Sequence, residues 1–215
     1  MILGIPVYDG VDVLDVTGPF EMLSWAGFEV QIAAAVAGPV RCRGEGMSII
    51  AKYDFKSAPQ YDVIWVPGGE PYALACLTYG MDQTYLDFVK RQAAKSAYVC
   101  SVCEGALLLA AAGLLDGYTV TTHWAFEICL RERYRNVTLA QGHPRYVWDR
   151  NRLTGGGISS GLDEALALIE RVFGTAVAQD TQRTTQYYPD PPVTSEMLPP
   201  PKSCVVPSGK PPGCA

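Results

Sequence analysis

The sequence predicts an α/β protein built on a mostly parallel β-sheet with helices on both faces. Short β-prone runs alternate with helix-prone segments as far as about residue 183, the pattern of parallel strands joined by crossover helices. One run, Asp62–Pro67, is apolar from its second residue onward, as expected for a strand covered on both faces. With 48% apolar residues among 215, the chain can fill the core of one medium-sized domain.

Local signals set the expected element boundaries. The first strand, residues 1–8, ends at the turn dipeptide Asp9-Gly10. The first helix is expected to start at Pro19, because proline suits the first helical turn, and to stop at Gly27. The remaining segments are expected to be strands at 29–36, 62–67, 97–100 and 119–122, hairpins at 38–47 and 145–153, and helices at 85–95, 106–112, 126–130, 161–173 and 175–183.

Proline clusters dominate the chain from residue 189 onward. Such a composition fits neither a helix interior nor a central strand. We therefore divide the chain into a domain, residues 1–188, and a tail, residues 189–215. The tail is expected to be extended on the body or on a partner subunit, or to be disordered. Its two cysteines, Cys204 and Cys214, could pair with each other, but no sequence feature requires it.

Charge and cysteine usage exclude several classes of protein. A formal net charge of -5 argues against a dedicated nucleic-acid surface and against electrostatic anchoring to membranes. No apolar run is long enough to span a bilayer, and the N-terminus resembles a first strand more than a signal peptide. Seven scattered cysteines without scaffold spacing predict mostly free thiols in a reducing compartment, the cytoplasm.

The stretch Ser101-Val102-Cys103-Glu104-Gly105 carries the strongest functional signal. It joins a β-prone run to a helix-prone run, so that Cys103 occupies a sharp strand-to-helix turn, as in a nucleophile elbow. A thiol at a helix N-terminus is expected to have a lowered pKa and to be partly thiolate. The alternative is that Cys103 is a small buried hydrophobe, as free cysteines often are.

Further candidate residues follow the ends of predicted strands, where sites form in parallel sheets. Asp15 is the expected proton partner of Cys103, with a pKa raised by burial and by the nearby thiolate, unless it only caps a helix, a role that Thr17 fills equally well. Glu104 either points into the site or only stabilises the helix dipole.

The glycines and histidines of the chain allow two interpretations each. Backbone N–H groups of Gly68 and Gly69 could stabilise negative charge on a substrate, or the pair could simply form a turn, and the Gly155–Gly157 run admits the same two interpretations. His123 is expected near the pocket without a required proton role, whereas His143 is expected to be exposed.

Other chemistry finds little support in the sequence. The Cys100-x-x-Cys103 spacing is a weak redox match, because Cys100 should face the opposite side of the sheet. Two histidines and scattered cysteines suggest no metal-ligand cluster. There is no P-loop, and no dinucleotide-binding glycine motif follows a strand.

Several linked motifs resemble the DJ-1/PfpI superfamily, most closely the isonitrile (isocyanide) hydratases, from residue 1 to about 192. The motifs that carry the resemblance occur in the same order as in that family: residues 14–19 (LDVTGP), 66–69 (VPGG), 101–105 (SVCEG), 111–115 (AAGLL), 121–124 (TTHW) and 153–158 (LTGGGI). Some regulators of the AraC type contain the same motifs. In contrast to the hydratases, which have threonine after the nucleophile, this chain has Glu104.

The resemblance implies a flavodoxin-like fold, like that of class I glutamine amidotransferases, and a homodimer with the active site near the interface. It implies that Cys103 attacks the terminal carbon of an isocyanide, that Asp15 transfers protons and activates water, and that an N-substituted formamide results. It implies a small-molecule substrate bound near Gly68, Gly69, His123, Gly156 and Ile158, with no metal or organic cofactor.

Three alternatives remain open at this stage. The elbow could serve a hydratase or lyase acting on another electrophile in a biosynthetic tailoring step. It could serve a glyoxalase or deglycase acting on reactive carbonyls. The third alternative is a non-catalytic sensor, in which Cys103 is oxidised reversibly or the pocket binds an effector.

Overall fold

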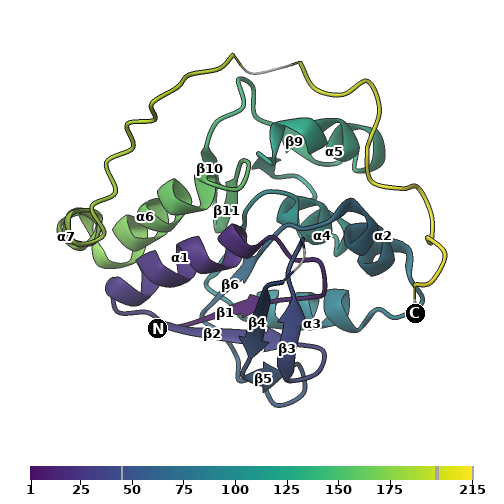
Figure 1. Ribbon diagram of the computed structural model, residues 1–215, viewed down its shortest axis with the longest axis horizontal. Helices are drawn as coiled ribbons and strands as arrows, with labels where there is room; N and C mark the ends of the chain where they lie inside the picture. The colour runs from purple at the N-terminus through teal and green to yellow at the C-terminus, as the bar shows by residue number, and fades with distance from the viewer. Residues whose placement is uncertain (45, 197–198, 215) are drawn as a thin grey trace.

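A computed structural model describes residues 1–44, 46–196 and 199–214. Its centre is a sheet with the strand order β10-β11-β7-β6-β1-β2-β5 (Figure 1). The pairs within this sheet are parallel except β10 with β11, a hairpin at the edge. The strands span Ile2–Pro6 (β1), Glu29–Ala34 (β2), Tyr53–Asp54 (β5), Val63–Val66 (β6), Tyr98–Ser101 (β7), Tyr146–Asp149 (β10) and Arg152–Gly155 (β11).

Two groups of helices flank this sheet. One group consists of α1 (Val13–Trp25), α6 (Ser160–Phe173) and α7 (Thr175–Thr184), which contact one another. The other consists of α2 (Pro71–Tyr79), α3 (Thr84–Ala93), α4 (Gly105–Ala111) and α5 (Glu127–Arg133), which is preceded by the short helix η1 (Trp124–Phe126). The predicted α/β architecture, a mostly parallel sheet with helices on both faces, is confirmed, and its topology is flavodoxin-like.

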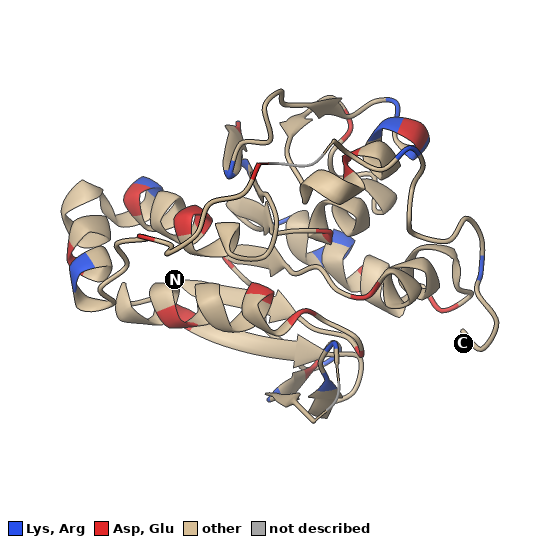
Figure 2. Ribbon diagram, turned by 45° about the horizontal axis from the view of Figure 1, so that its top comes forward, with Lys and Arg blue, Asp and Glu red and all other residues tan. Residues whose placement is uncertain are grey.

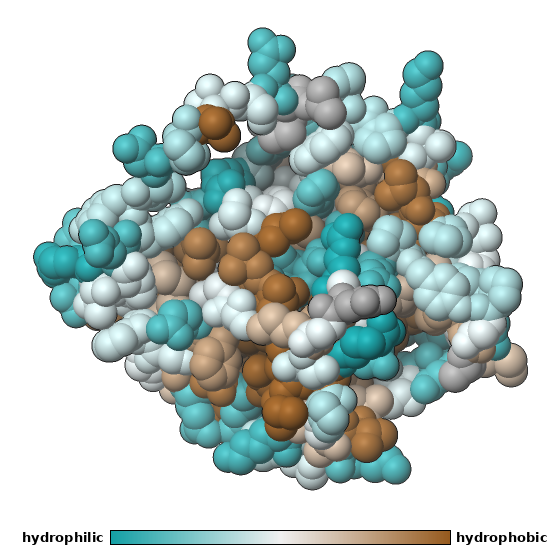
Figure 3. Space-filling view, in the orientation of Figure 1, coloured by the Kyte–Doolittle hydropathy of each residue, from teal (hydrophilic) through white to brown (hydrophobic). Residues whose placement is uncertain are grey.

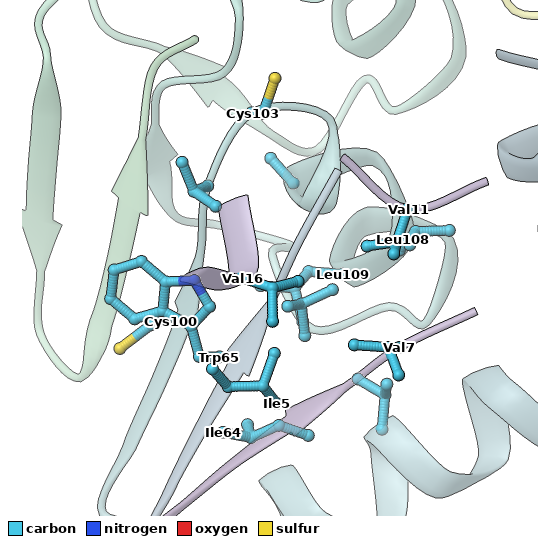
Figure 4. Close-up of a cluster of buried hydrophobic side chains, with 14 of the residues drawn as sticks. Ile5, Val7, Val11, Val16, Ile64, Trp65, Cys100, Cys103, Leu108 and Leu109 are labelled. Carbon is cyan, nitrogen blue, oxygen red and sulfur yellow. The ribbon is translucent and has the colours of Figure 1, made fainter. Parts of the chain in front are cut away.

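The core lies between the sheet and these helices. β1 and β6 contribute fully buried aliphatic side chains, among them Ile5 and Ile64, and Trp65 is buried completely beside them (Figure 4). Both faces of β6 are covered, which explains why its four residues are all apolar. The carboxyl ends of β6 and β7 consequently lie side by side, with Val66 paired to Ser101.

The start of α1 differs from the sequence prediction. The helix begins at Val13 rather than at Pro19, so that Pro19 lies inside it and Asp15 lies in its first turn. The prediction that Asp15 directly follows a strand was therefore wrong. The missing N–H of Pro19 leaves the Asp15 carbonyl without its helical partner, and the indole Nε1 of Trp65 donates to that carbonyl at 3.3 Å instead.

Two smaller sheets lie beside the central one. The predicted hairpin near residue 40 is confirmed as β3 (Gly38–Arg41) paired with β4 (Ser48–Ala51), and Glu45 in its connection lies outside the described residues. β8 (Thr119–Val120) pairs with β9 (Thr138–Leu139) in a separate sheet. His123 thus follows a strand of this small sheet and not a strand of the central one, contrary to the prediction.

The cysteines are paired to a degree that the sequence did not predict. Disulfides join Cys76 to Cys214 and Cys129 to Cys204, and only Cys42, Cys100 and Cys103 are free. The prediction of mostly free thiols was wrong, as was the suggestion that the two tail cysteines pair with each other. Each tail cysteine instead reaches a helix of the domain, because the tail returns to the body. Within the described part of residues 189–215 there is no helix or strand.

Charge is spread over the molecule, with acidic and basic residues interspersed along the ribbon (Figure 2). Within the described ranges, no helix combines the length and apolar character needed to cross a bilayer. The cytoplasmic location stays a prediction, and the two disulfides count against it.

Candidate active site

Cys103 occupies the sharp turn that the sequence predicts. β7 ends at Ser101, α4 begins at Gly105, and Cys103 between them has a φ of 57°, in the left-handed region. Its backbone N–H donates to the Gly156 carbonyl at 2.8 Å, which supports this strained conformation. The sulfur points away from the buried aliphatic cluster below it (Figure 4). The nucleophile-elbow geometry is present in the fold.

Asp15 is held against the loop that follows β6. Its Oδ2 accepts a hydrogen bond of 2.8 Å from the Gly68 N–H, and its side chain is completely buried. Oδ1 has no hydrogen-bond partner among the described residues. Burial is the main cause of a pKa raised well above the usual range of an aspartate, and the neighbouring Glu104 carboxylate adds to it. Asp15 therefore binds its proton more tightly than an ordinary aspartate, and the direction of this shift is the one predicted.

Glu104 points into the site. Its side chain is 2% exposed and contacts the Cys103 thiol, and an added Cβ on Gly68 would lie 2.3 Å from its Oε2. Burial raises the pKa of Glu104 to about 7, although the contact with Cys103 opposes this rise. A carboxyl group that titrates near neutral pH can both donate and accept a proton.

The pKa of Cys103 is shifted in the direction opposite to the prediction. Burial raises it well above the usual range of a thiol, and the carboxylates of Asp15 and Glu104 raise it further. The backbone N–H of Ile158 is the opposing influence that lowers it. The expected lowering rested on the N-terminus of α4, but this helix is too short and too surrounded by acidic groups to outweigh burial. At rest, Cys103 is a thiol.

Asp12 and Arg43 complete the polar surroundings, and the sequence analysis missed both. One ligand atom each of Asp12, Asp15, Cys103 and Glu104 lies within 4.8 Å of the others. Arg43, in the connection between β3 and β4, pairs with Asp12 at 3.3 Å. The signal for Asp12 was its position three residues before Asp15, because the residue that precedes a helix starting at Val13 lies close to the first helical turn.

This acidic group contradicts the expectation that the chain gathers no metal-ligand cluster. The raised pKa values of Asp15, Glu104 and Cys103 mean that these groups bind protons more tightly than usual, and protons compete with a cation for the same lone pairs. We therefore interpret these side chains as proton donors and acceptors beside the thiol and not as metal ligands.

A cavity of about 290 Å³ lies next to the elbow and brings together three of the predicted binding residues, His123, Gly156 and Ile158. The Nδ1 of His123 accepts from the Ala125 N–H at 3.2 Å, and burial lowers the pKa of this imidazole. The ring is consequently neutral with its proton on Nε2, beside Gly157. His123 can thus donate a hydrogen bond from the cavity wall.

Two other predictions about this region need correction. His143 is half-buried rather than exposed, because its Nδ1 hydrogen-bonds with Glu127 at the rim of the cavity. The Gly68 N–H is occupied by Asp15, so it positions this carboxyl rather than stabilising charge on a substrate. Gly69 packs against the Gly10 carbonyl, where an added Cβ would lie 2.5 Å away.

Glu164 of α6 is a further buried carboxyl that the sequence analysis missed. Both of its oxygens are buried without a hydrogen-bond partner in the described part of the chain, and burial raises its pKa well above the usual range. An added Cβ on Gly155 would lie 2.0 Å from its Oε2. Glycine is thus required at the end of β11 to make room for this carboxyl.

Comparison with known proteins identifies the family of this chain. The DJ-1/PfpI family matches residues 3–171. The chain belongs to the DJ-1/PfpI family. Isonitrile hydratase of Pseudomonas putida is 37% identical over 194 residues, which cover 90% of this chain and 81% of that protein. The crystal structure of a ThiJ/PfpI family protein from Pseudomonas syringae superposes with a TM-score of 0.81 at 34% identity, covering 89% of this chain and 77% of that one.

Other members of the family differ in function from the hydratase. The transcriptional regulator GbdR of Pseudomonas aeruginosa is 30% identical over 130 residues, 60% of this chain and 34% of the regulator. The crystal structure of Drosophila melanogaster DJ-1beta has a TM-score of 0.73 at 18% identity, covering 86% of this chain and 97% of that one, and shows the shared fold. Membership of the DJ-1/PfpI family therefore identifies the fold, and the chemistry must be argued from the site.

Proposed function

We propose that this protein is a cofactor-independent hydratase that adds water to an isocyanide and releases an N-substituted formamide. The observation that carries the proposal is a thiol at a strained elbow, in contact with two buried carboxyl groups that have raised pKa values. The similarity to isonitrile hydratase over 90% of the chain supports the choice of substrate class.

The first half of the reaction forms a covalent adduct. The Cys103 thiol gives its proton to the Glu104 carboxylate, and the sulfur forms a bond to the terminal carbon of R–N≡C. The protonated Asp15 delivers its proton to that carbon, which gives the thioimidate R–N=CH–S–Cys103. The neighbouring carboxyl groups make this transfer short, because the reacting atoms lie within 4.8 Å of one another.

The second half of the reaction consumes water. Asp15, now a carboxylate, takes a proton from the water molecule as the water oxygen bonds to the thioimidate carbon, and Glu104 gives the proton that it took from the thiol to the nitrogen. The carbon–sulfur bond then breaks, the new hydroxyl passes its proton to the departing sulfur, and R–NH–CHO leaves with Asp15 protonated and Glu104 ionised again. The net change is the addition of one water molecule, so the reaction as written needs neither a metal nor an organic cofactor.

The position of the cavity supports a small substrate. Cys103 is fully buried, and the cavity beside it is lined by its neighbours Gly156 and Ile158 and by Leu14, which adjoins Asp15. Cys103, Asp15 and Glu104 do not line this cavity, so the proposal requires its walls to move enough for the isocyanide carbon to reach the sulfur while the R group stays in the cavity. The Nε2–H of His123 then faces the R group and selects substrates that carry a hydrogen-bond acceptor there.

The test is turnover of a panel of alkyl and aryl isocyanides, followed as formamide by mass spectrometry. We expect turnover by the wild type, none by Cys103→Ala, and a rate lowered about 10²- to 10⁴-fold by Asp15→Asn, since general acid–base groups contribute on this order. Formamide production that Cys103→Ala leaves unchanged would overturn the proposal.

The same protein preparation distinguishes the alternatives. Conversion of methylglyoxal to lactate without glutathione, with no turnover of isocyanides, would replace the proposal by a glyoxalase activity. Oxidation of Cys103 at low peroxide with no turnover of either substrate would favour a sensor, the class of function that the similarity to part of GbdR favours.

A further inference from the structure

The C-terminal end of the tail is attached to the body at two places. Disulfides join Cys204 to Cys129 of α5 and Cys214 to Cys76 of α2. Between these anchors, Val206 is 3% exposed and belongs to the hydrophobic core. Such burial of an apolar side chain shows that this segment is packed on the domain.

Hydrogen bonds hold the same segment. The guanidinium of Arg133, at the end of α5, donates to the Val206 carbonyl, and the hydroxyl of Tyr72, in α2, donates to the Pro212 carbonyl. We call the described residues between 189 and 214 the strap. It leaves the body after α7, passes α5 and ends beside α2 (Figure 1). Its first part, residues 189–196, is exposed throughout.

The two helices that hold the strap continue from loops of the active site. α2 begins two residues after Gly69, and the preceding Gly68 holds Asp15. α5 follows η1, which begins immediately after His123 of the cavity wall. The strap therefore links α2, which follows the loop that holds Asp15, to α5, which follows the segment that contains His123.

The distribution of cysteines follows their exposure. The three free cysteines, Cys42, Cys100 and Cys103, are fully buried. Three of the four bonded cysteines, Cys76, Cys204 and Cys214, are partly exposed. No cysteine in the described ranges is both free and exposed, although the chain has seven. A protein that meets a thiol oxidant would need this distribution to avoid unwanted disulfides.

We propose that this protein matures in a disulfide-forming environment, where the strap is closed covalently onto α2 and α5 and braces two walls of the active site. Each disulfide forms when two thiols lose two protons and two electrons to a disulfide-bearing oxidant, which becomes a dithiol. The proposal goes beyond the hydratase reaction and does not depend on its substrate. It replaces the reducing compartment that the sequence alone suggested.

The active-site thiol is compatible with this environment. Cys103 is inaccessible to a bulky oxidant because it is fully buried, and its raised pKa keeps it as a thiol, which is the unreactive form in disulfide exchange. The nucleophile can therefore stay reduced while the four strap and helix cysteines are oxidised.

Thiol counting and disulfide mapping test the first part of the proposal. The full chain is refolded in a glutathione redox buffer, unfolded without reductant and alkylated. We expect three alkylated cysteines, Cys42, Cys100 and Cys103, and cross-linked peptides that join 76 to 214 and 129 to 204. Seven alkylated cysteines, or a cross-link that includes Cys103, would overturn it. This readout needs no substrate, so it stands apart from the test of hydratase activity.

Hydrogen exchange and thermal unfolding test the bracing. The wild type with and without reductant is compared with Cys204→Ser/Cys214→Ser and with the control Ser203→Ala/Ser208→Ala, which changes two exposed strap residues. We expect loss of the disulfides to lower Tm by about 5–15 °C and to speed amide exchange in α2 and α5 but not in α6. Should the double cysteine variant fail to fold, reduced wild type gives the same comparison. Unchanged exchange in α2 and α5 would overturn the bracing.

Discussion

At the scale of single residues, burial and then neighbouring carboxyl groups set the pKa values of the site, and Glu104 takes part in each of these shifts. Its carboxyl group contacts the thiol, and its charged form raises the pKa of both Cys103 and Asp15. Since its own pKa is about 7, the number of protons in the site changes near neutral pH. A neutral residue at this position would leave the carboxyl groups of Asp12 and Asp15 within 4.8 Å of the sulfur.

Glu104 is expected to make the folded protein less stable as the pH rises. Its folded-state pKa of about 7 lies above the ordinary value of 4.5, so between these pH values the folded chain binds a proton that the unfolded chain has lost. The free energy of unfolding therefore falls across this window, by an amount on the order of 3 kcal/mol, and stays lower above it.

Urea unfolding of wild type and Glu104→Gln at pH 5 and pH 7.5 measures this contribution. We expect the variant to lose less stability between the two pH values, and the pH–rate profile of any turnover to lose its inflection near pH 7. Equal losses in the two proteins would show that Glu104 is ionised at both pH values.

Gly157 is expected to control the orientation of His123. An added Cβ would lie 2.4 Å from the ring Cδ2, and the flexible imidazole can turn away to relieve this contact. Gly157→Ala should therefore change the free energy of unfolding by less than about 1 kcal/mol while raising KM several-fold, because the Nε2–H no longer faces the cavity. Calorimetry together with steady-state kinetics checks both halves, and an unchanged KM would remove His123 from substrate binding.

At the scale of elements, packing between neighbours places the catalytic groups. The first turn of α1 brings Asp15 to the loop after β6, where the Gly68 N–H fixes the carboxyl and Trp65 satisfies the carbonyl freed by Pro19. The elbow between β7 and α4 lies beside the same loop because β6 and β7 are adjacent parallel strands. The site is therefore assembled from three segments that are far apart in the sequence and adjacent in the fold.

Gly105 is expected to be essential for the elbow to pack on β6. An added Cβ would lie 2.0 Å from the Val66 carbonyl oxygen, and backbone cannot move aside as a side chain can. Gly105→Ala should lower the free energy of unfolding by about 1–3 kcal/mol, in contrast to Gly157→Ala. Chemical denaturation of the two variants side by side provides the measurement, and equal stabilities would show that the start of α4 can shift.

At the scale of the whole molecule, apolar side chains remain exposed. Large exposed ones include Leu14 and Trp25 of α1, and Leu14 also lines the cavity beside Cys103. Apolar residues gather in a band across the middle of one face (Figure 3). An exposed apolar patch is typical of a surface that meets another protein. This supports the expected homodimer with its active sites near the interface.

Light scattering after size exclusion tests the homodimer. We expect a mass about twice the 23.3 kDa of the chain for the wild type, and a shift toward the monomer for Trp25→Glu, which places a charge on the exposed face of α1. A monomeric wild type at micromolar concentration would refute the prediction.

Several features were predictable because they depend on neighbours in the sequence. The apolar run of β6 and the strand-to-helix turn at Cys103 both follow from local periodicity and turn chemistry. The raised pKa of Cys103 was not predictable, since it depends first on burial by the surrounding fold and then on the carboxyl groups of Asp15 and Glu104. The start of α1 was misplaced because Pro19 favours a first turn locally, whereas Trp65 makes it acceptable inside the helix.

The sequence by itself determined the α/β architecture and the residue that occupies the elbow, because periodicity and turn-forming residues act over a few positions. Only the tertiary structure decided that Asp12 and Glu104 join Asp15 beside Cys103 and that the tail is bonded to α2 and α5. The disulfides span 138 and 75 residues, and contacts between such distant positions depend on how the whole chain packs rather than on any local preference.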